Sequence, residues 1–248
     1  MIKFFRKIRQ KLLSENKFSK YLIYAIGEIV LVVIGILIAL QINNWNESRK
    51  LESKKQELII NLINDFEGNI EQLQPAIKES DTLSFKMKAF LNNAYLPNLT
   101  ISVDSLKVLA DGFFRPVYFF PSIVSYDEAK SNGNLTLLKN KELFKDFNAF
   151  HEELSNFQNL QNDSRESYFN GPIWELKKLA GSGGIFIGFK DHYIKNSDDV
   201  SYIKLINLPL ATAVFENEAT LNYNVNLHLK NMEFLSNKIV QTLIEMKK

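Results

Sequence analysis

The sequence predicts a mainly α-helical protein, in which an N-terminal transmembrane helix continues into a stalk and is followed by a bundle-like helical domain outside the membrane. Three observations support this class. Residues 21–40 form an apolar run with one charge in twenty residues. Later segments carry apolar residues at alternating spacings of three and four, which is typical of amphipathic helices. The chain has no cysteine, so the outer domain must be stabilised by packing alone.

The formal net charge of +2 hides an uneven distribution of charged residues. Residues 1–20 hold seven Lys and Arg against one Glu, a local net of +6, and the rest of the chain therefore carries −4. This pattern indicates a basic cytoplasmic segment, whose interleaved apolar residues also fit a helix on the membrane surface. Because nucleic acid binding needs a basic face, we expect no nucleic acid partner for the acidic remainder.

Residues 21–42 are the predicted transmembrane helix, and the lipid bilayer is its predicted partner. Twenty helical residues rise about 30 Å, which matches the hydrocarbon core of a membrane. Lys20, Tyr21 and Trp45 are the expected anchors at the two interfaces. The run is longer than the roughly 7–15 apolar residues of a signal peptide and lacks a small-residue cleavage site, which favours an uncleaved anchor.

The basic residues on each side of the run predict its orientation. Seven Lys and Arg precede it, and Arg49, Lys50, Lys54 and Lys55 follow it. Since basic residues are retained in the cytoplasm, the N-terminus is expected to be cytoplasmic and the C-terminal domain periplasmic. The predicted location is a bacterial inner membrane.

Glu28 is the ionisable residue inside the apolar run. It lies about 10 Å into the predicted span, where a carboxylate usually faces protein or water. Glu28, Gly35 and Ala39 fall within a narrow arc of the helix, and the small pair Gly35 and Ala39 would let another helix approach closely. Two interpretations stay open. The three residues form a helix–helix contact, or the Glu28 carboxylate reaches the cytoplasmic interface beside Lys20.

Residues 43–57 are the predicted helical stalk, and residues 58–248 the predicted outer domain. Opposite charges three residues apart, Glu47/Lys50, Glu52/Lys55 and Lys54/Glu57, support a helix in the stalk. An apolar stripe then starts at Ile59, and Pro75 is expected to kink or divide this helix because it cannot donate the i→i−4 bond. The stripe consists of Ile59, Leu62, Phe66, Ile70, Leu73 and Ile77, followed by Leu83, Met87, Phe90 and Leu91, and ends near Pro97.

The remaining chain predicts loops and three further helices. The aromatic residues in the loop-rich region 92–121 are expected to pack in the core. Ser122 is expected to cap a short helix that stops at Gly133, and Asn140 to cap the next helix. The apolar faces are Phe113, Phe114, Tyr118, Phe119 and Phe120 in the loop region, Leu143, Phe147, Phe150, Leu154 and Phe157 after Asn140, and Leu221, Val225, Leu229, Met232, Leu235, Ile239 and Leu243 in a last helix over about 211–245.

Two stretches resemble an uncharacterised family of single-span membrane proteins from Bacteroidota. The first is the membrane block from Gly27-Glu28 through Gly35, Ala39 and Trp45-Asn46-Glu47, and the second is Ser131-Asn-Gly-Asn-Leu135 followed by Leu137-Leu138. The resemblance implies the topology and no activity. Asp81-Thr82-Leu83 and Asp104-Ser105-Leu106 are also similar to the O-glycosylation acceptor of that phylum.

The sequence predicts no catalytic residue, cofactor or metal site. His151, His192 and His228 are far apart in the sequence, and none belongs to an HExxH pattern. His151 is expected at the edge of the core, and His228 on or beside the apolar face. The glycine-rich stretch 181–188 lacks the Lys-Ser/Thr of a phosphate-binding loop, and Ile185–Phe189 is a short strand or an apolar loop.

Three functions remain open at this point. The first is a non-enzymatic interaction or scaffold protein of the cell envelope, with an envelope protein or a second copy as partner. The second is a ligand-sensing domain, which would need a partner because the chain offers only about twenty cytoplasmic residues for output. The third is an envelope enzyme, and it predicts a polar, concave pocket with convergent carboxylates or histidines.

Overall fold

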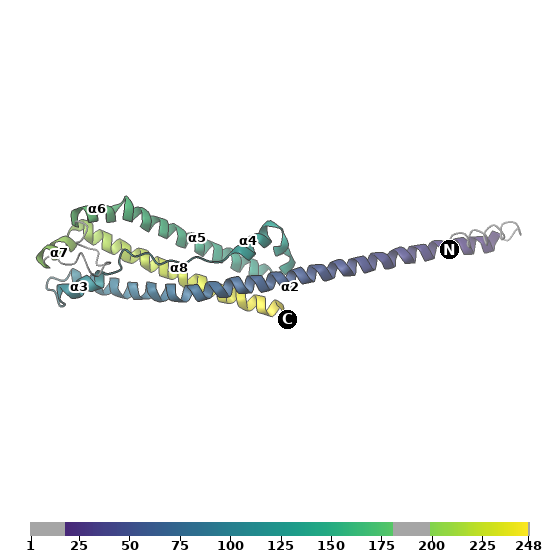
Figure 1. Cartoon of the computed structure of the whole chain (residues 1–248), viewed down its shortest axis with the longest axis horizontal. Coiled ribbons are helices and arrows are strands. Elements are labelled where there is room, and N and C mark those ends of the chain that lie inside the picture. Colours follow the sequence, from purple (N-terminus) through teal and green to yellow (C-terminus); the bar gives the residue numbers. More distant parts are fainter. Residues whose placement is uncertain (1–17, 181–198, 248) are drawn as a thin grey trace. The chain divides into compact units, whose positions relative to one another are not determined.

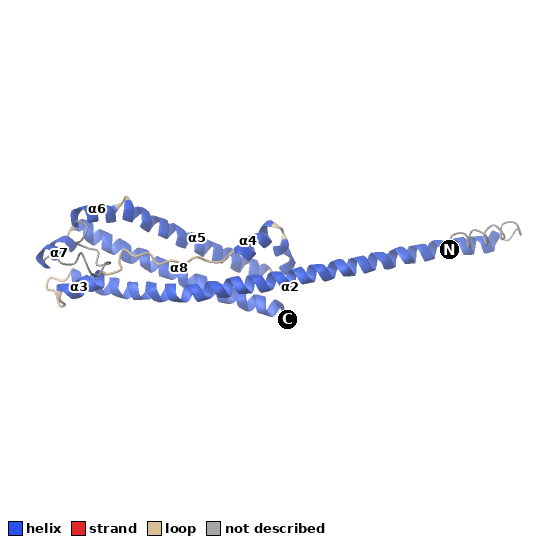
Figure 2. Cartoon of the chain, in the orientation of Figure 1, coloured by secondary structure: helices blue, strands red, loops and turns tan. Residues whose placement is uncertain are grey.

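The computed structural model describes residues 18–180 and 199–247, and every regular element in these ranges is a helix (Figure 2). The predicted mainly α class is therefore confirmed. The stretch Ile185–Phe189 lies outside the described residues. The elements are α2 (Phe18–Ala94), α3 (Val103–Ala110), α4 (Val124–Ser131), the 3₁₀ helix η1 (Asn134–Leu138), α5 (Lys141–Phe169), α6 (Pro172–Ala180), α7 (Asp199–Ile206) and α8 (Pro209–Lys247).

Helix α2 contributes to two compact units, Met1–Glu57 and Leu58–Lys248. In the first unit its large apolar side chains are exposed. Two of the predicted stalk ion pairs form there, Lys50 with Glu47 at 3.0 Å and Lys55 with Glu52 at 3.8 Å. The residues of each pair are neighbours at i,i+3 spacing, so the pairs stabilise the polar part of the helix locally.

The second unit is a bundle in which the C-terminal part of α2, α5 and α8 are the long helices (Figure 1). Helix α8 runs antiparallel to both others. It meets α5 through Lys238 and Asp146 near one end and through His228 and Glu153 further along. The short helices α3, α4, α6 and α7 connect the long ones.

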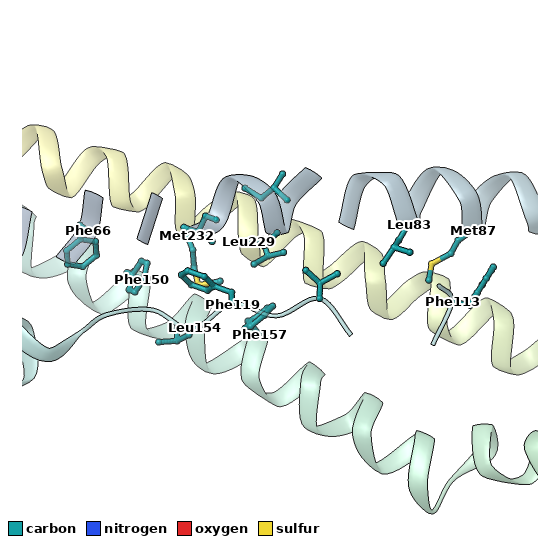
Figure 3. Close-up of a cluster of buried hydrophobic side chains, with 14 of the residues drawn as sticks. Phe66, Leu83, Met87, Phe113, Phe119, Phe150, Leu154, Phe157, Leu229 and Met232 are labelled. Atoms are coloured by element: carbon teal, nitrogen blue, oxygen red, sulfur yellow. The ribbon is translucent and has the colours of Figure 1, made fainter. Parts of the chain in front are cut away.

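Aromatic side chains dominate the core of the bundle (Figure 3). Near α4 the ring of Phe66 packs edge-on against Phe150, with centroids 5.1 Å apart. Near α3 the rings of Phe90 and Phe215 are 4.7 Å apart. Such pairs contribute about 0.5–1.5 kcal/mol beyond the burial of their area. All five residues of the predicted seam on α5 are buried, namely Leu143, Phe147, Phe150, Leu154 and Phe157.

An extended segment, residues 115–123, fills the space between α2 and α5. Over residues 116–120 its side chains alternate between exposed and buried, as the period of two in an extended chain requires. Phe119 enters the core beside Phe157 (Figure 3), with ring centroids 6.3 Å apart. Tyr118 and Phe120 point outward instead and are 61% and 71% exposed. The prediction that all five aromatic residues of this region pack in the core is therefore wrong for these two.

The start of α4 differs from the prediction. Ser122 does not cap α4, because its hydroxyl donates to Asp65 Oδ1 at 2.8 Å. The other Asp65 oxygen accepts the backbone N–H of Ser125 at 2.9 Å. A carboxylate from α2 therefore supplies the cap that a local side chain usually supplies. Asn140 does cap α5 as predicted, and its Oδ1 accepts the N–H of Leu143 at 3.0 Å.

Pro75 does not divide α2, which is one helix from Phe18 to Ala94. Proline removes one backbone hydrogen bond and leaves the carbonyl of Glu71 without its i+4 donor. Both Pro75 and Glu71 are exposed, so water can satisfy that carbonyl. The cost is therefore low enough for the buried stripe on either side to keep the helix continuous.

Candidate functional site

The apolar part of α2 is the first candidate for a functional surface. It contains an 18-residue window with a mean hydropathy of 2.7, and none of that window is buried. A helix this apolar on all sides differs from an amphipathic core helix, which hides one stripe and exposes the other. By length and composition α2 is able to cross a membrane.

The predicted residues of this segment lie on α2 as follows. Glu28 is partly exposed, whereas Gly35 and Ala39 are exposed. A Cβ atom added to Gly35 would meet nothing within 4 Å, so the surface there is open. The Trp45 side chain is 66% exposed. The Lys20 and Tyr21 side chains lie outside the part of the chain whose side chains the structure describes.

A polar strip joins α8 to α2 inside the bundle. Asn222 is 8% exposed, and its amide donates to the Ser84 hydroxyl at 2.7 Å and to the Ser80 carbonyl at 3.2 Å. One turn later, Asn226 donates to Asp81 Oδ1 at 3.0 Å. Buried amides with several partners fix one register of two helices, because any slip would leave them unpaired.

A second polar strip joins α8 to α5. The Nδ1 atom of His228 lies 2.6 Å from Glu153 Oε2, and Asn231 donates to the other oxygen of that carboxylate at 3.2 Å. Asp146, with a side chain 9% exposed, accepts from Lys238 at 2.6 Å. His228 is thus a hydrogen-bonded histidine at the edge of the apolar face, as predicted.

Neither strip is predicted from the sequence. The apolar spacing predicts Leu221, Val225 and Leu235 on the buried face of α8, but these residues are only partly buried. The centre of the inner face is occupied instead by Glu218, Asn222, Asn226 and Ser236. A signal was present, because Asn222 and Asn226 are four residues apart and lie within the apolar stripe. It could not be interpreted without knowing their partners on α2.

Among the described residues, three buried side-chain oxygens lack a hydrogen-bond partner, those of Tyr95, Tyr202 and Glu218, and two of these belong to side chains that are almost fully buried. One is Glu218, 4% exposed, whose Oε1 has no partner. Burial raises the pKa of this carboxyl to about 7. The other is the Tyr202 hydroxyl on α7, and burial raises the pKa of this phenol above its ordinary value.

The other histidine within the described ranges is half-buried. The His151 ring on α5 packs against Tyr126 in a tilted arrangement with ring centroids 4.5 Å apart, and burial lowers the pKa of its imidazole. Its position at the edge of the core is as predicted. His192 lies outside the described residues. Within residues 18–180 and 199–247, no group of three or more His, Asp or Glu side chains is arranged to hold a metal ion.

An open groove of about 330 Å³ lies between α2 and the loop after α3. The cations Lys78, Lys86 and Arg115 line it together with the carboxylates Glu79 and Asp111, and Asp111 is 4.0 Å from the Lys86 amine. Gly112 forms one wall with φ = 94°, and a Cβ atom there would lie 2.7 Å from Leu83 Cδ2. The left-handed backbone conformation favours glycine at this position, and a larger residue would also displace the end of the Leu83 side chain.

The stretch from Ser131 to Leu138 forms the turn between α4 and η1. Gly133 adopts the left-handed conformation with φ = 77°, which terminates α4. Asn132 accepts the N–H of Asn134 at 3.0 Å, and Leu138 is buried. The residues that carried the second part of the family resemblance therefore build a turn and anchor it to the core.

A comparison of sequences places the chain in a family. The model of a family of unknown function, DUF6090, matches residues 28–152, half of the chain, and the protein belongs to this family. The matched range starts at Glu28 in the apolar segment and ends within α5. Neither a curated protein nor a solved structure matches the chain.

Proposed function

We propose that the protein is anchored in a bacterial inner membrane by one helix and acts as a non-enzymatic interaction or scaffold protein of the cell envelope. Residues 1–20 would be cytoplasmic, residues 21–42 the span, residues 43–57 a stalk and residues 58–248 a periplasmic domain. The resemblance to single-span proteins of Bacteroidota supports the same arrangement.

The observation that carries this proposal is the exposure of the apolar segment. Its Ile, Leu and Val side chains are about half exposed or more, as for Ile23 at 69% and Leu31 at 63%. Burying one such side chain is worth about 1.5–3 kcal/mol. In water, this stabilising free energy would be lost at every exposed position of the segment. Lipid removes the penalty, because a helix satisfies its own backbone bonds and presents only apolar side chains.

The anchor can be tested by carbonate extraction of membranes from cells that express the full chain. We expect the protein to stay in the membrane pellet. A variant with Leu31→Arg and Leu37→Arg should move to the soluble fraction, since each charge near the centre of a span costs about 2.5–3.5 kcal/mol. The matched control is Leu51→Arg in the stalk, which should leave the protein in the pellet. Complete extraction of the unmodified protein would refute the anchor.

The orientation requires a separate experiment. A reporter that is active only in the periplasm, fused after Lys248, should be active because basic residues predominate before the span. An inactive but well-expressed fusion would reverse the proposed topology.

The proposed contact at Glu28, Gly35 and Ala39 predicts association of the spans. Gly35→Leu adds a side chain into space that is open in the protein itself, so the helix should persist while close approach of a second helix is blocked. Association of the span in a membrane reporter assay should fall, whereas Ile36→Leu should leave it unchanged. Equal association in both variants would favour the alternative, in which Glu28 reaches the interface.

Ligand sensing is the second candidate function, and the groove beside α3 favours it. Three cations and two carboxylates line the groove and leave a local net charge of +1, which suits an anionic ligand. If this function holds, inorganic phosphate or a dicarboxylate should raise the melting temperature of the full chain, and Lys78→Gln with Arg115→Gln should abolish the rise. An unchanged melting temperature with both anions would remove the support that the groove gives.

A further inference from the structure

The outward face of α8 carries a second apolar seam. Tyr223, Leu227 and Phe234 are 65%, 46% and 69% exposed. With Lys230 they follow spacings of four, three and four residues, which are the spacings of a helix-packing seam. At about 100° per residue the four positions fall within an arc of about 60°. The solvated face of a bundle helix usually carries polar residues, so these exposed rings require an explanation.

The charge in the seam is paired. The Lys230 amine donates to Asp81 Oδ1 of α2 at 2.8 Å, and the two side chains are 48% and 53% exposed. One turn further along α2 stands Phe85, which is 74% exposed. Because Asp81 touches α8 at Lys230, residue 85 is on the same side of α2. We call Tyr223, Leu227, Lys230 and Phe234, with Asp81 and Phe85 beside them, the outer seam.

We propose that the outer seam is a homodimer surface, on which α8 of one copy packs parallel to α8 of a second copy. Each seam residue then meets its own equivalent across a two-fold axis, as isologous interfaces require. Tyr223 and Phe234 supply the aromatic anchors that dominate such interfaces, and Leu227 lies between them.

The charges of the outer seam favour a second copy over an unrelated partner. A two-fold axis brings two Lys230 side chains together, and each has its own Asp81 to offset the repulsion. Because Asp81 remains half exposed, it is also accessible to the Lys230 of the other copy. Each copy thus presents one positive and one negative charge to the other copy, and the two surfaces are complementary in charge. A single lysine in an apolar seam lowers stability but fixes the register of two helices.

Parallel packing rests on the proposed function, because two copies anchored in one membrane have the same orientation. Confinement to the membrane also raises the effective concentration of the two surfaces. A seam of only a few exposed side chains can then associate without the large interface that a soluble dimer needs.

The absence of cysteine allows a direct test with single cysteine variants of the full chain in native membranes. Leu227→Cys should form a disulfide-linked dimer when a copper oxidant is added, since a two-fold seam brings residue 227 next to its equivalent. The matched control is Ser155→Cys, an exposed position on α5. A dimer at Leu227→Cys and none at Ser155→Cys is the expected result.

A second substitution tests whether the seam itself drives the contact. Phe234→Lys in the Leu227→Cys background should lower the cross-linked fraction about tenfold, the effect of removing one interface anchor. Phe120→Lys is the matched control, because this ring is equally exposed but lies on the extended segment. It should leave cross-linking unchanged, and all variants should keep the helical content of the parent.

Several outcomes would overturn the homodimer. These are the absence of cross-linking at Leu227→Cys, equal cross-linking at Ser155→Cys, an equal effect of both lysine substitutions, or a cross-linked product whose mass reveals a different protein. Failure of the anchor is distinguished by fractionation, since a soluble protein that still cross-links at Leu227→Cys would retain the seam and refute the membrane span.

Discussion

The inner and outer faces of α8 each depart from the usual distribution of side chains at several positions. The inner face places Glu218, Asn222 and Asn226 in the core, whereas the outer face exposes Tyr223 and Phe234. The inner amides hydrogen-bond to α2 and fix the register of the bundle. Asn222 and Asn226 can be buried because α2 offers them hydrogen-bond partners, whereas the exposed rings of Tyr223 and Phe234 lie on the surface that we propose for binding.

The largest expected effect concerns the inner residue Glu218. Burial raises its pKa from 4.5 to about 7, so the folded state holds this proton more tightly than the unfolded state. The resulting stability is fully present below about pH 4.5 and is lost as the pH rises through about 7, a loss of about 3 kcal/mol. Glu218→Gln should abolish this pH dependence.

Urea unfolding of the full chain in detergent, at about pH 4.5 and pH 8, measures the effect. The matched control is Glu216→Gln, an exposed glutamate on the same helix. It should keep the pH dependence of the parent. If Glu218→Gln loses as much stability as the parent between the two pH values, the buried carboxyl does not carry the effect.

The next largest effect separates two neighbouring residues on opposite faces. Asn222→Ala removes the partner of Ser80 and Ser84 and should lower the free energy of unfolding by about 1–3 kcal/mol. Tyr223→Ala removes only an exposed ring and should change it by no more than about 0.5 kcal/mol. Chemical unfolding of both variants under one condition measures this difference. Equal losses would contradict the contrast between the two faces.

The smallest effect belongs to the ion pair at the edge between the faces. Lys230→Ala should lower stability by less than about 1 kcal/mol, because both partners are half exposed. The Lys230 hydrogen bond lowers the pKa of Asp81 below 3.8. The ion pair therefore contributes to stability at pH values above 3.8, and this contribution is lost as the pH falls through the lowered pKa of Asp81. Thermal unfolding at neutral and acidic pH should show the deficit of Lys230→Ala only at neutral pH.

Local patterns in the sequence predicted the helices well. The Asn140 cap is predictable because its partner, the N–H of Leu143, lies three residues away. The cap of α4 is not predictable for the opposite reason, since Asp65 lies 60 residues before Ser125. The sequence predicts Tyr118 in the core because aromatic residues usually pack there. Its exposure depends on which face of the extended segment meets α2 and α5.

The candidate functional surfaces differ in the same respect, since one can be recognised from local sequence and the other cannot. The apolar run with Glu28, Gly35 and Ala39 is visible in the sequence, because twenty consecutive apolar residues need no tertiary contact to be recognised. The outer seam is not visible by itself. Leu227 and Leu229 are equally apolar, and only the packing of α8 against α2 and α5 decides that the first is exposed and the second buried.

The sequence by itself determined the helical class, an apolar segment able to span a membrane and the caps and stripes that local spacing encodes. These features depend on the helix propensity of the residues and on the spacing of apolar side chains along the helix, and both are set by residues close together in the sequence. The tertiary structure alone decided which polar groups are buried, as with Asn222, and which apolar groups are left outside, as with Phe234. Both depend on the packing of α8 against helices whose contacts lie 75 to 149 residues away in the sequence, and such pairings have no signature in local sequence.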